Sequence, residues 1–351
     1  MARVKSFSAK KKKSLLPKWD LSDLYEGTDS LVLKSDLKRA RKATLTFRKT
    51  YFGSITKLSG NALGIAISKF EQIDELLSRI LSYAQLVHAA NVTDPQIAKF
   101  NQTIQETVTD ISTNLIFFTL EINKIRNSAM KKKLAAPKLA YYKSWIKSLR
   151  TFKAHQLDEG IERILSEKRV TGGAAWTRLF DETIARVRFP VRGKEKTLEE
   201  TLSDLSDGNG EARKLAAKAL GKGLKKNVHL FALITNTLIK DKEIETRWRK
   251  YAEPQSHRNL SNHLEDEVVA TLSSTVRKAY PDLSHRYYKL KAQWFGKRRL
   301  DYWDRNAPLP DADMALISWN TAKTIVLDAY RQFSPELWTV GKLFFENSWI
   351  D

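Results

Sequence analysis

The stretch that predicts the fold is residues 66–111, AISKFEQIDELLSRILSYAQLVHAANVTDPQIAKFNQTIQETVTDI. Its first half carries apolar residues at alternating spacings of four and three: Ala66, Phe70, Ile73, Leu77, Ile80, Ala84 and Val87. This spacing places all of them on one face of a long α-helix. We interpret the stripe as core packing and not as a cofactor site.

A turn and a second helix are predicted after this stripe. The segment 91–95 breaks the pattern, with Thr93 or Asp94 suited to cap the next helix and Pro95 suited to its first position. The same spacing then continues through Ile97, Phe100, Ile104, Val108, Ile111, Leu115, Phe118, Ile122 and Ile125. Two long helices joined by a short turn predict an antiparallel helical hairpin, and the fold class that follows is mainly α.

The rest of the chain predicts more helices and one short β-hairpin. Residues 183–193 alternate and end in a turn, which favours a strand. Thr197 and Glu200 form a capping-box pattern that opens another helix. Further helices are predicted over 211–220, 226–250, 261–280 and 282–296. We expect a disordered basic tail over 1–13, a helical domain over 14–190 and a second helical region over 191–351.

The composition limits the partners and the compartment. There are 61 Lys and Arg residues against 40 Asp and Glu residues, which gives a net charge of +21. Such a charge favours anionic partners, although it suggests nucleic acid only weakly and also suits general solubility. The absence of cysteine excludes disulfides, thiol nucleophiles and Cys-ligated zinc. No stretch resembles a signal peptide or a membrane span, so we expect a cytoplasmic protein.

Motifs for chemistry are scarce. None of the six histidines forms His-Glu-x-x-His or has a second histidine four residues away, so no helix offers a zinc site of that type. There is no phosphate-binding Gly-rich loop and no Gly-x-Ser-x-Gly nucleophile motif. The apolar run 343–351 at the end either docks back as a final element or belongs to the front part of a longer protein.

Several segments, taken in chain order, resemble the oligoendopeptidase F group of zinc metallopeptidases. They are PKWDLSDLY (17–25), AHQLDEGIERILSE (154–167), AAWTRLFDE (174–182), SHRNLSN (256–262), YYKLKA (287–292), DYWDRNAPL (301–309) and FFENSWID (344–351). The resemblance runs from about Leu16 to the last residue. It implies a mostly helical protein in which an N-terminal helical domain and a catalytic domain wall a groove for short peptides.

The same resemblance implies where the catalytic residues lie. In the family, the zinc-binding helix, the Glu base and the oxyanion-stabilising residues follow the segment that resembles Asp351. No catalytic or metal residue is therefore carried over, residues 191–351 correspond to an incomplete catalytic domain, and the chain alone is expected to be inactive. Zinc would belong to the full-length family. Four residues are candidates for a retained groove wall: His257, Arg258, Tyr287 and Tyr288.

Two functional hypotheses follow. In the first, the chain is the N-terminal part of a peptidase, and a complementing C-terminal chain supplies the zinc helix. In the second, it is a non-enzymatic helical module that binds acidic peptides, RNA or a complementing chain. The aromatic residues in 294–303 beside Lys297, Arg298 and Arg299 suit either nucleic-acid stacking or a core with a charged rim.

Overall fold

The computed structural model describes residues 17–310 and 316–350, which form two compact units. The larger unit contains described residues 28–310, and the smaller one combines 17–27 with 316–350. The basic tail expected over 1–13 lies outside the described residues. The sequence also predicts a boundary at residue 190 between an N-terminal helical domain and an incomplete catalytic domain. This boundary stays a prediction.

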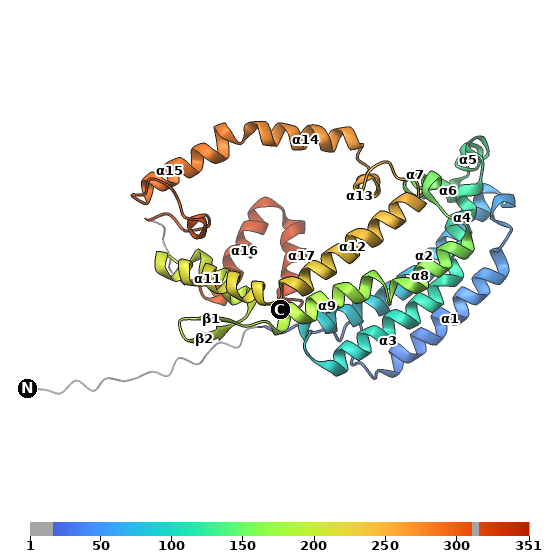
Figure 1. The fold of residues 1–351 in the computed structure, drawn as a ribbon. Coiled ribbons are helices and arrows are strands. Elements are labelled where there is room, and N and C mark those ends of the chain that lie inside the picture. Colours follow the sequence, from blue (N-terminus) through green and yellow to red (C-terminus); the bar gives the residue numbers. More distant parts are fainter. Residues whose placement is uncertain (1–16, 311–315, 351) are drawn as a thin grey trace, which may run out of the picture. The chain divides into compact units, whose positions relative to one another are not determined.

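The larger unit consists of helices and one two-stranded sheet (Figure 1). Its α-helices are α1 (Leu31–Tyr51), α2 (Gly60–Ala90), α3 (Pro95–Ser112), α4 (Ile116–Lys124), α5 (Asn127–Lys133), α6 (Pro137–Ala140), α7 (Lys143–Thr151), α8 (Glu159–Arg169), α9 (Gly173–Arg186), α10 (Leu198–Ser203), α11 (Gly210–Lys226), α12 (Val228–Trp248), α13 (Ser256–Ser261), α14 (Asp266–Ala279) and α15 (Arg286–Trp294). The strands are β1 (Phe189–Val191) and β2 (Lys194–Lys196). The 3-10 helices are η1 (Ile55–Lys57), η2 (Thr113–Leu115), η3 (Lys153–His155), η4 (Asp204–Ser206) and η6 (Tyr302–Asp304), and η5 (Pro281–His285) is a π-helical turn.

The predicted helical hairpin is confirmed in α2 and α3. The Asp94 side chain accepts hydrogen bonds from the N–H groups of Gln96 and Ile97, and Pro95 takes the first helical position. One expectation is wrong, because the second stripe is not a single helix. Helix α3 ends at Ser112, and η2 separates it from α4. Thr113 Oγ1 donates to the carbonyl of Asp110 there, an interaction through which a side chain competes with regular helix hydrogen bonds.

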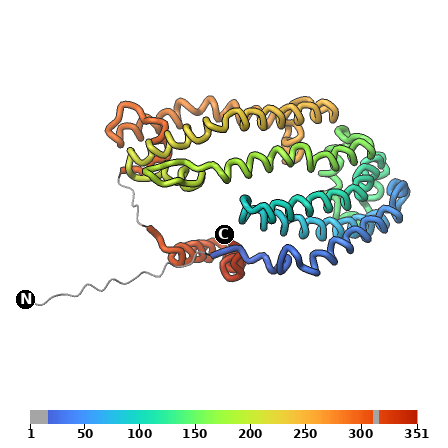
Figure 2. The backbone as a smooth tube through the Cα atoms, turned by 60° about the horizontal axis from the view of Figure 1, so that its bottom comes forward, coloured from blue at the N-terminus to red at the C-terminus, as the bar shows by residue number. Residues whose placement is uncertain are grey.

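The core of this bundle contains an aromatic cluster among aliphatic side chains. Figure 2 shows α1, α2 and α3 packed side by side. Phe47 of α1 meets Phe118 of α4 edge-on, with ring centroids 5.0 Å apart, and Phe70 of α2 stacks on the same ring at 5.0 Å. Phe118 is fully buried. Burial of one such side chain contributes about 1.5–3 kcal/mol, so this cluster is a main source of stability for the hairpin.

The β-hairpin is shorter than predicted. Residues 183–186 complete α9 instead of starting a strand, and only β1 and β2 pair, with Phe189 opposite Lys196. The turn uses positive φ angles at Arg192 and Gly193, as two-residue hairpin turns require. Phe180 explains the longer helix, because its ring contacts Phe231 of α12 at 5.5 Å and holds α9 against that helix.

The start of α10 agrees with the sequence. Thr197 accepts a hydrogen bond from the N–H of Glu200, and the Glu200 carboxylate accepts one from the N–H of Thr197. Both halves of the predicted capping box are therefore present.

The smaller unit is a helical hairpin with the first described residues packed on it. Its helices are α16 (Trp319–Phe333) and α17 (Pro335–Glu346), and they lie next to each other in Figure 2. Gly341 permits the close approach, because a Cβ there would lie 2.7 Å from the ring of Tyr330. Trp349 Nε1 donates to the carboxylate of Asp23 at 2.7 Å, and the N–H of Asp20 donates to the carbonyl of Ser348. The apolar run at 343–350 therefore docks back onto 17–27.

None of the helices over 17–310 and 316–350 has the length and apolar character needed to cross a membrane.

Candidate functional site

The family-like segment 154–167 is held by a charged contact with the end of α12. Arg249 donates to both carboxylate oxygens of Glu162, at 2.7 and 2.9 Å, and its Nε donates to Glu245. Burial raises the pKa of Glu162, but hydrogen bonds from Arg249 and from the N–H of Leu157 lower it by more, so the net shift of the pKa is downward. Glu162 therefore stays ionised and orients the guanidinium.

Histidine 155 completes this contact from the other side. Its Nδ1 donates to the carbonyl of Arg249 at 2.8 Å, which fixes the proton on Nδ1 because a carbonyl can only accept. The Arg249 guanidinium donates back to the His155 carbonyl at 3.3 Å. The two segments are thus joined by reciprocal hydrogen bonds, which give His155 a positioning role in the fold.

Tyr251 extends the contact to His257, one of the predicted groove residues. The Tyr251 ring stacks on His155 at 4.0 Å and meets His257 edge-on at 5.5 Å. Phe152 contacts His257 from the opposite segment at 5.6 Å. Burial lowers the pKa of His257, and the positive charge of Lys242 lowers it further. His257 is therefore a neutral imidazole at pH 7 that can exchange hydrogen bonds with a peptide.

The structure does not bring the four predicted groove residues together. His257 and Arg258 lie on α13, whereas Tyr287 and Tyr288 lie on α15, at the far end of α14 (Figure 1). Helix α14 has 14 residues and so extends about 21 Å. All four side chains are exposed. They stay candidates for one extended surface, with two separate contact points.

The surface between these points is an apolar stripe, which we call the α14–α15 stripe. Its members follow helical spacing yet are exposed, with Leu272 64% and Leu283 67% accessible: Val268, Leu272, Val276, Tyr280, Leu283, Tyr287, Leu290 and Trp294. Within the described residues, no side chain of α14 is buried. A stripe of this length at helical spacing is typical of a face that packs on protein.

The chain that follows α15 is anchored by a buried ion pair. Arg213 of α11 donates through Nε and Nη2 to one carboxylate oxygen of Asp304, at 3.2 and 2.8 Å. Lys297 binds the other oxygen at 2.5 Å, and Lys291 of α15 donates to the carbonyl of Arg305. This network fixes the position of α15 relative to α11, and it gives Lys297 a structural partner.

A zinc ion does not fit the residues present. Over 17–310 and 316–350 there is no group of three or more His, Asp or Glu side chains placed to hold a metal. We therefore derive no catalytic step through zinc from these residues.

Sequence reasoning missed Arg249 and Tyr251. Glu162 lies 87 residues before Arg249, so no local spacing marks the pair. The resemblance covers 154–167 and 256–262 but not Arg249 and Tyr251, which lie between these segments in the sequence. Arg249 binds Glu162, and Tyr251 contacts both His155 and His257, so these two residues join the segments.

Comparisons with known proteins agree with this fold. Residues 121–189 match the family model described as oligopeptidase F. A curated oligoendopeptidase F homologue from Borreliella burgdorferi is 22% identical over 293 residues, which cover 83% of this chain and 49% of that protein. The chain thus spans about half the length of this relative.

Solved structures give the same result. Oligoendopeptidase F from Enterococcus faecium superposes with a TM-score of 0.70 at 19% identity, covering 93% of this chain and 62% of that one. PZ peptidase A, solved with an inhibitor, gives a TM-score of 0.68 at 15% identity, covering 91% and 54%. These likenesses confirm the mainly α fold. The family model, the curated relative and the fold together identify the chain as a counterpart of the N-terminal portion of oligoendopeptidase F-like peptidases.

Proposed function

We propose that this chain forms the N-terminal portion of a peptidase that hydrolyses short peptides, and that a complementing polypeptide supplies the zinc-binding helix. The complementing polypeptide corresponds to the part of the longer relatives that this chain does not cover. By itself the chain is expected to hydrolyse no peptide bond. A cytoplasmic location, expected from the sequence, stays a prediction.

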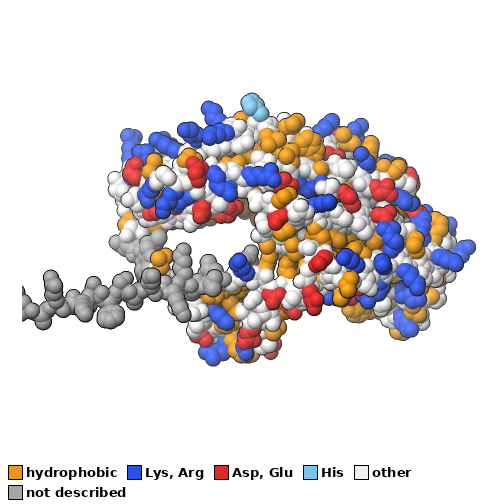
Figure 3. All heavy atoms as spheres, turned by 90° about the horizontal axis from the view of Figure 1, so that it is seen from below, with side chains coloured by type: hydrophobic (Ala, Val, Ile, Leu, Met, Phe, Trp, Pro, Cys, Tyr) orange, Lys and Arg blue, Asp and Glu red, His pale blue; other side chains and the backbone are white. Residues whose placement is uncertain are grey.

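The observation that carries this proposal is the α14–α15 stripe. Burial of apolar area is favourable by about 25 cal/mol per Å², so covering this long exposed stripe with a complementary apolar surface would favour binding. Figure 3 shows that hydrophobic side chains elsewhere on the molecule also reach the surface between Lys and Arg side chains. Helices α16 and α17 add exposed apolar residues in the smaller unit, among them Phe333 and Val340.

The peptide surface would use the two contact points at the ends of α14. The neutral His257 and the cationic Arg258 offer hydrogen bonds and charge at one end. Tyr287 and Tyr288 offer aromatic faces at the other, with their ring centroids 5.7 Å apart. We propose that the complementing polypeptide covers the α14 part of the stripe and leaves these four residues facing the groove.

The test is reconstitution. The purified chain is mixed with the uncovered part of the Borreliella relative, and cleavage of a fluorogenic oligopeptide is followed with zinc and with a chelator. We expect chelator-sensitive cleavage in the mixture. Leu272→Asp, in the stripe, should reduce co-purification of the two polypeptides. Ser274→Asp is the matched control, because position 274 lies about 200° around the helix from Leu272.

The second hypothesis, a non-enzymatic module that binds acidic peptides or RNA, is favoured by the net charge of +21. The logarithm of the association constant for a single-stranded RNA should then fall linearly with the logarithm of salt concentration. The reason is that Lys and Arg side chains displace the counterions condensed on the RNA phosphates. RNA binding that is absent or independent of salt would remove this version.

A further inference from the structure

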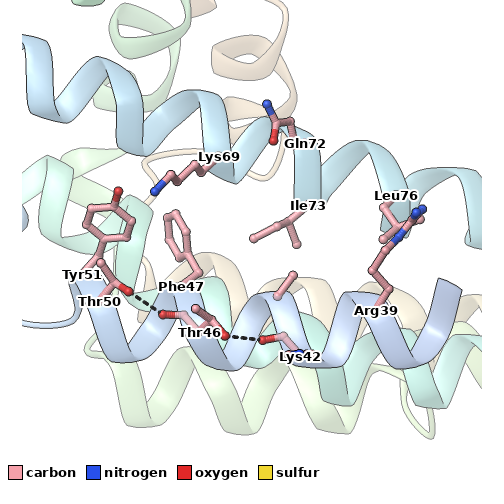
Figure 4. Close-up of a pocket in the computed structure, with 11 residues that line it drawn as sticks. Arg39, Lys42, Thr46, Phe47, Thr50, Tyr51, Lys69, Gln72, Ile73 and Leu76 are labelled. Carbon is pink, nitrogen blue, oxygen red and sulfur yellow. Dashed lines mark hydrogen bonds between the residues drawn. The ribbon is translucent and has the colours of Figure 1, made fainter. Parts of the chain in front are cut away.

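A pocket of about 560 Å³ lies between α1 and α2, and none of the residues discussed above as groove candidates lines it. Its floor consists of Phe47, Tyr51 and Ile73, which are buried and lie on the apolar faces of the two helices (Figure 4). Pockets that bind small molecules commonly have this size and an apolar lining.

The charged side chains that line the pocket are all cations. They are Arg39, Lys42 and Lys69, and no lining residue is a carboxylate. Arg39 already pairs with Asp36 at 2.9 Å. Over the described residues, neither Lys42 nor Lys69 has a carboxylate within 4 Å. Two ammonium groups therefore stand beside an apolar floor without a counter-charge from the protein.

The position of Lys69 suits recognition of a ligand over that floor. Its Nζ lies 5.8 Å from the centroid of the Tyr51 ring, and Figure 4 shows its side chain pointing toward Tyr51 and Phe47. The two threonines of the pocket offer less, because Thr46 and Thr50 already donate their hydroxyl protons to carbonyls of their own helix. Among the described residues of the pocket, the charged donors without a carboxylate partner are therefore the ammonium groups of Lys42 and Lys69, and the Gln72 amide adds a neutral donor.

We propose that this pocket binds an aliphatic carboxylate, with its hydrocarbon chain on Phe47 and Ile73 and its carboxylate at Lys69, while Lys42 adds positive charge farther along the same pocket. The apolar chain displaces water from the floor, and the carboxylate provides the missing counter-charge. Both parts are needed, since an exposed ion pair alone binds weakly. The site is formed by α1 and α2 alone, so it does not depend on the proposed peptidase function.

The experiment is calorimetric titration of the whole chain with decanoate below its micelle concentration. We expect saturable binding of one decanoate, and no binding of acetate, which lacks the chain, or of decylammonium, which reverses the charge. Lys69→Met should weaken binding roughly threefold, and the double variant with Lys42→Met roughly tenfold, because both lysines contribute positive charge to the pocket. Lys38→Met removes a charge from the same helix outside the pocket, so its affinity should stay within about twofold of the unaltered chain's.

A second variant tests the floor at constant charge. Ala43 lines the pocket, and Ala43→Phe places a ring in it, which should abolish decanoate binding while circular dichroism shows an unchanged helix content. The proposal is overturned if decylammonium binds as well as decanoate. It is also overturned if Lys38→Met weakens binding as much as the pocket lysine variants, or if Ala43→Phe leaves the affinity unchanged.

Discussion

The substitution Asp304→Ala should destabilise the larger unit strongly. Asp304 and Arg213 form a salt bridge at 2.8 Å, and their side chains are 0% and 3% exposed. Two further hydrogen bonds hold the guanidinium on the carbonyls of Asp207 and Gly208, so Arg213 cannot turn outward easily. Removing the carboxylate leaves a buried cation without a counter-charge. Such changes cost about 3–5 kcal/mol, a large share of the stability of an ordinary domain.

Urea unfolding followed by circular dichroism measures this loss. The control is Asp301→Ala, which removes the more exposed carboxylate partner of Lys297 and should cost less than about 1 kcal/mol. The double variant Arg213→Met with Asp304→Leu removes both buried charges and should recover most of the lost stability. The reasoning fails if Asp304→Ala is no more destabilising than Asp301→Ala.

The same pair predicts a pH dependence. Burial raises the Asp304 pKa, but hydrogen bonds from Lys297 and Arg213 lower it by more, so the pKa of this carboxyl lies below the ordinary range of an aspartate. A depressed carboxylate pKa contributes stability that is fully present above about pH 4 to 5 and is lost as the pH falls through the folded-state pKa. The difference in free energy of unfolding between the unaltered chain and Asp304→Ala should be constant from pH 7 to about 5 and shrink below about 4.

Two further predictions use matched positions. On α11, Gly223→Ala should destabilise the chain by about 1–3 kcal/mol, because the added Cβ would lie 2.6 Å from the ring of Phe189. Gly221→Ala meets open space and should stabilise the chain by about 0.5–1 kcal/mol. Thermal melts of the two variants compare these effects directly. At the end of α12, Arg249→Met should cost about 2–3 kcal/mol in urea unfolding, because it breaks the partly buried bidentate pair with Glu162. Arg247→Met removes a side chain that is 65% exposed and should cost under about 0.5 kcal/mol. Equal losses would contradict a stabilising role for the Arg249–Glu162 pair.

Much of the helical architecture could be predicted from local pattern. The stripes of α2 and α3 follow helical spacing, and the cap at Asp94 and the capping box at Thr197 use side chains that act within three residues. The predicted strand over 183–193 failed at its start because the same residues also fit a helix. The spacing from Phe180 to Ile184 suits continuation of α9. The ring of Phe180 contacts Phe231 of α12, far along the chain, and this contact favours the helix over the strand.

The candidate site was less predictable, since its contacts join distant segments. The resemblance led to His257 and the tyrosines of α15, and the helix predicted over 261–280 already lay between them, but nothing local shows that the apolar face of this helix is exposed. Arg249 and Glu162 are likewise paired only by the fold. The pocket between α1 and α2 depends on how Lys69 meets Tyr51 across two helices, which no single-helix pattern reveals.

The central proposal is that this chain supplies the helical wall of a peptidase and that a complementing polypeptide supplies the metal-dependent chemistry. The most direct measurement is zinc-dependent cleavage of a fluorogenic oligopeptide by the purified 351-residue chain, alone and with the complementing part of the longer relative. We expect no chelator-sensitive turnover by the chain alone and measurable turnover in the mixture. Clear zinc-dependent turnover by the chain alone, abolished by a chelator, would contradict the proposal.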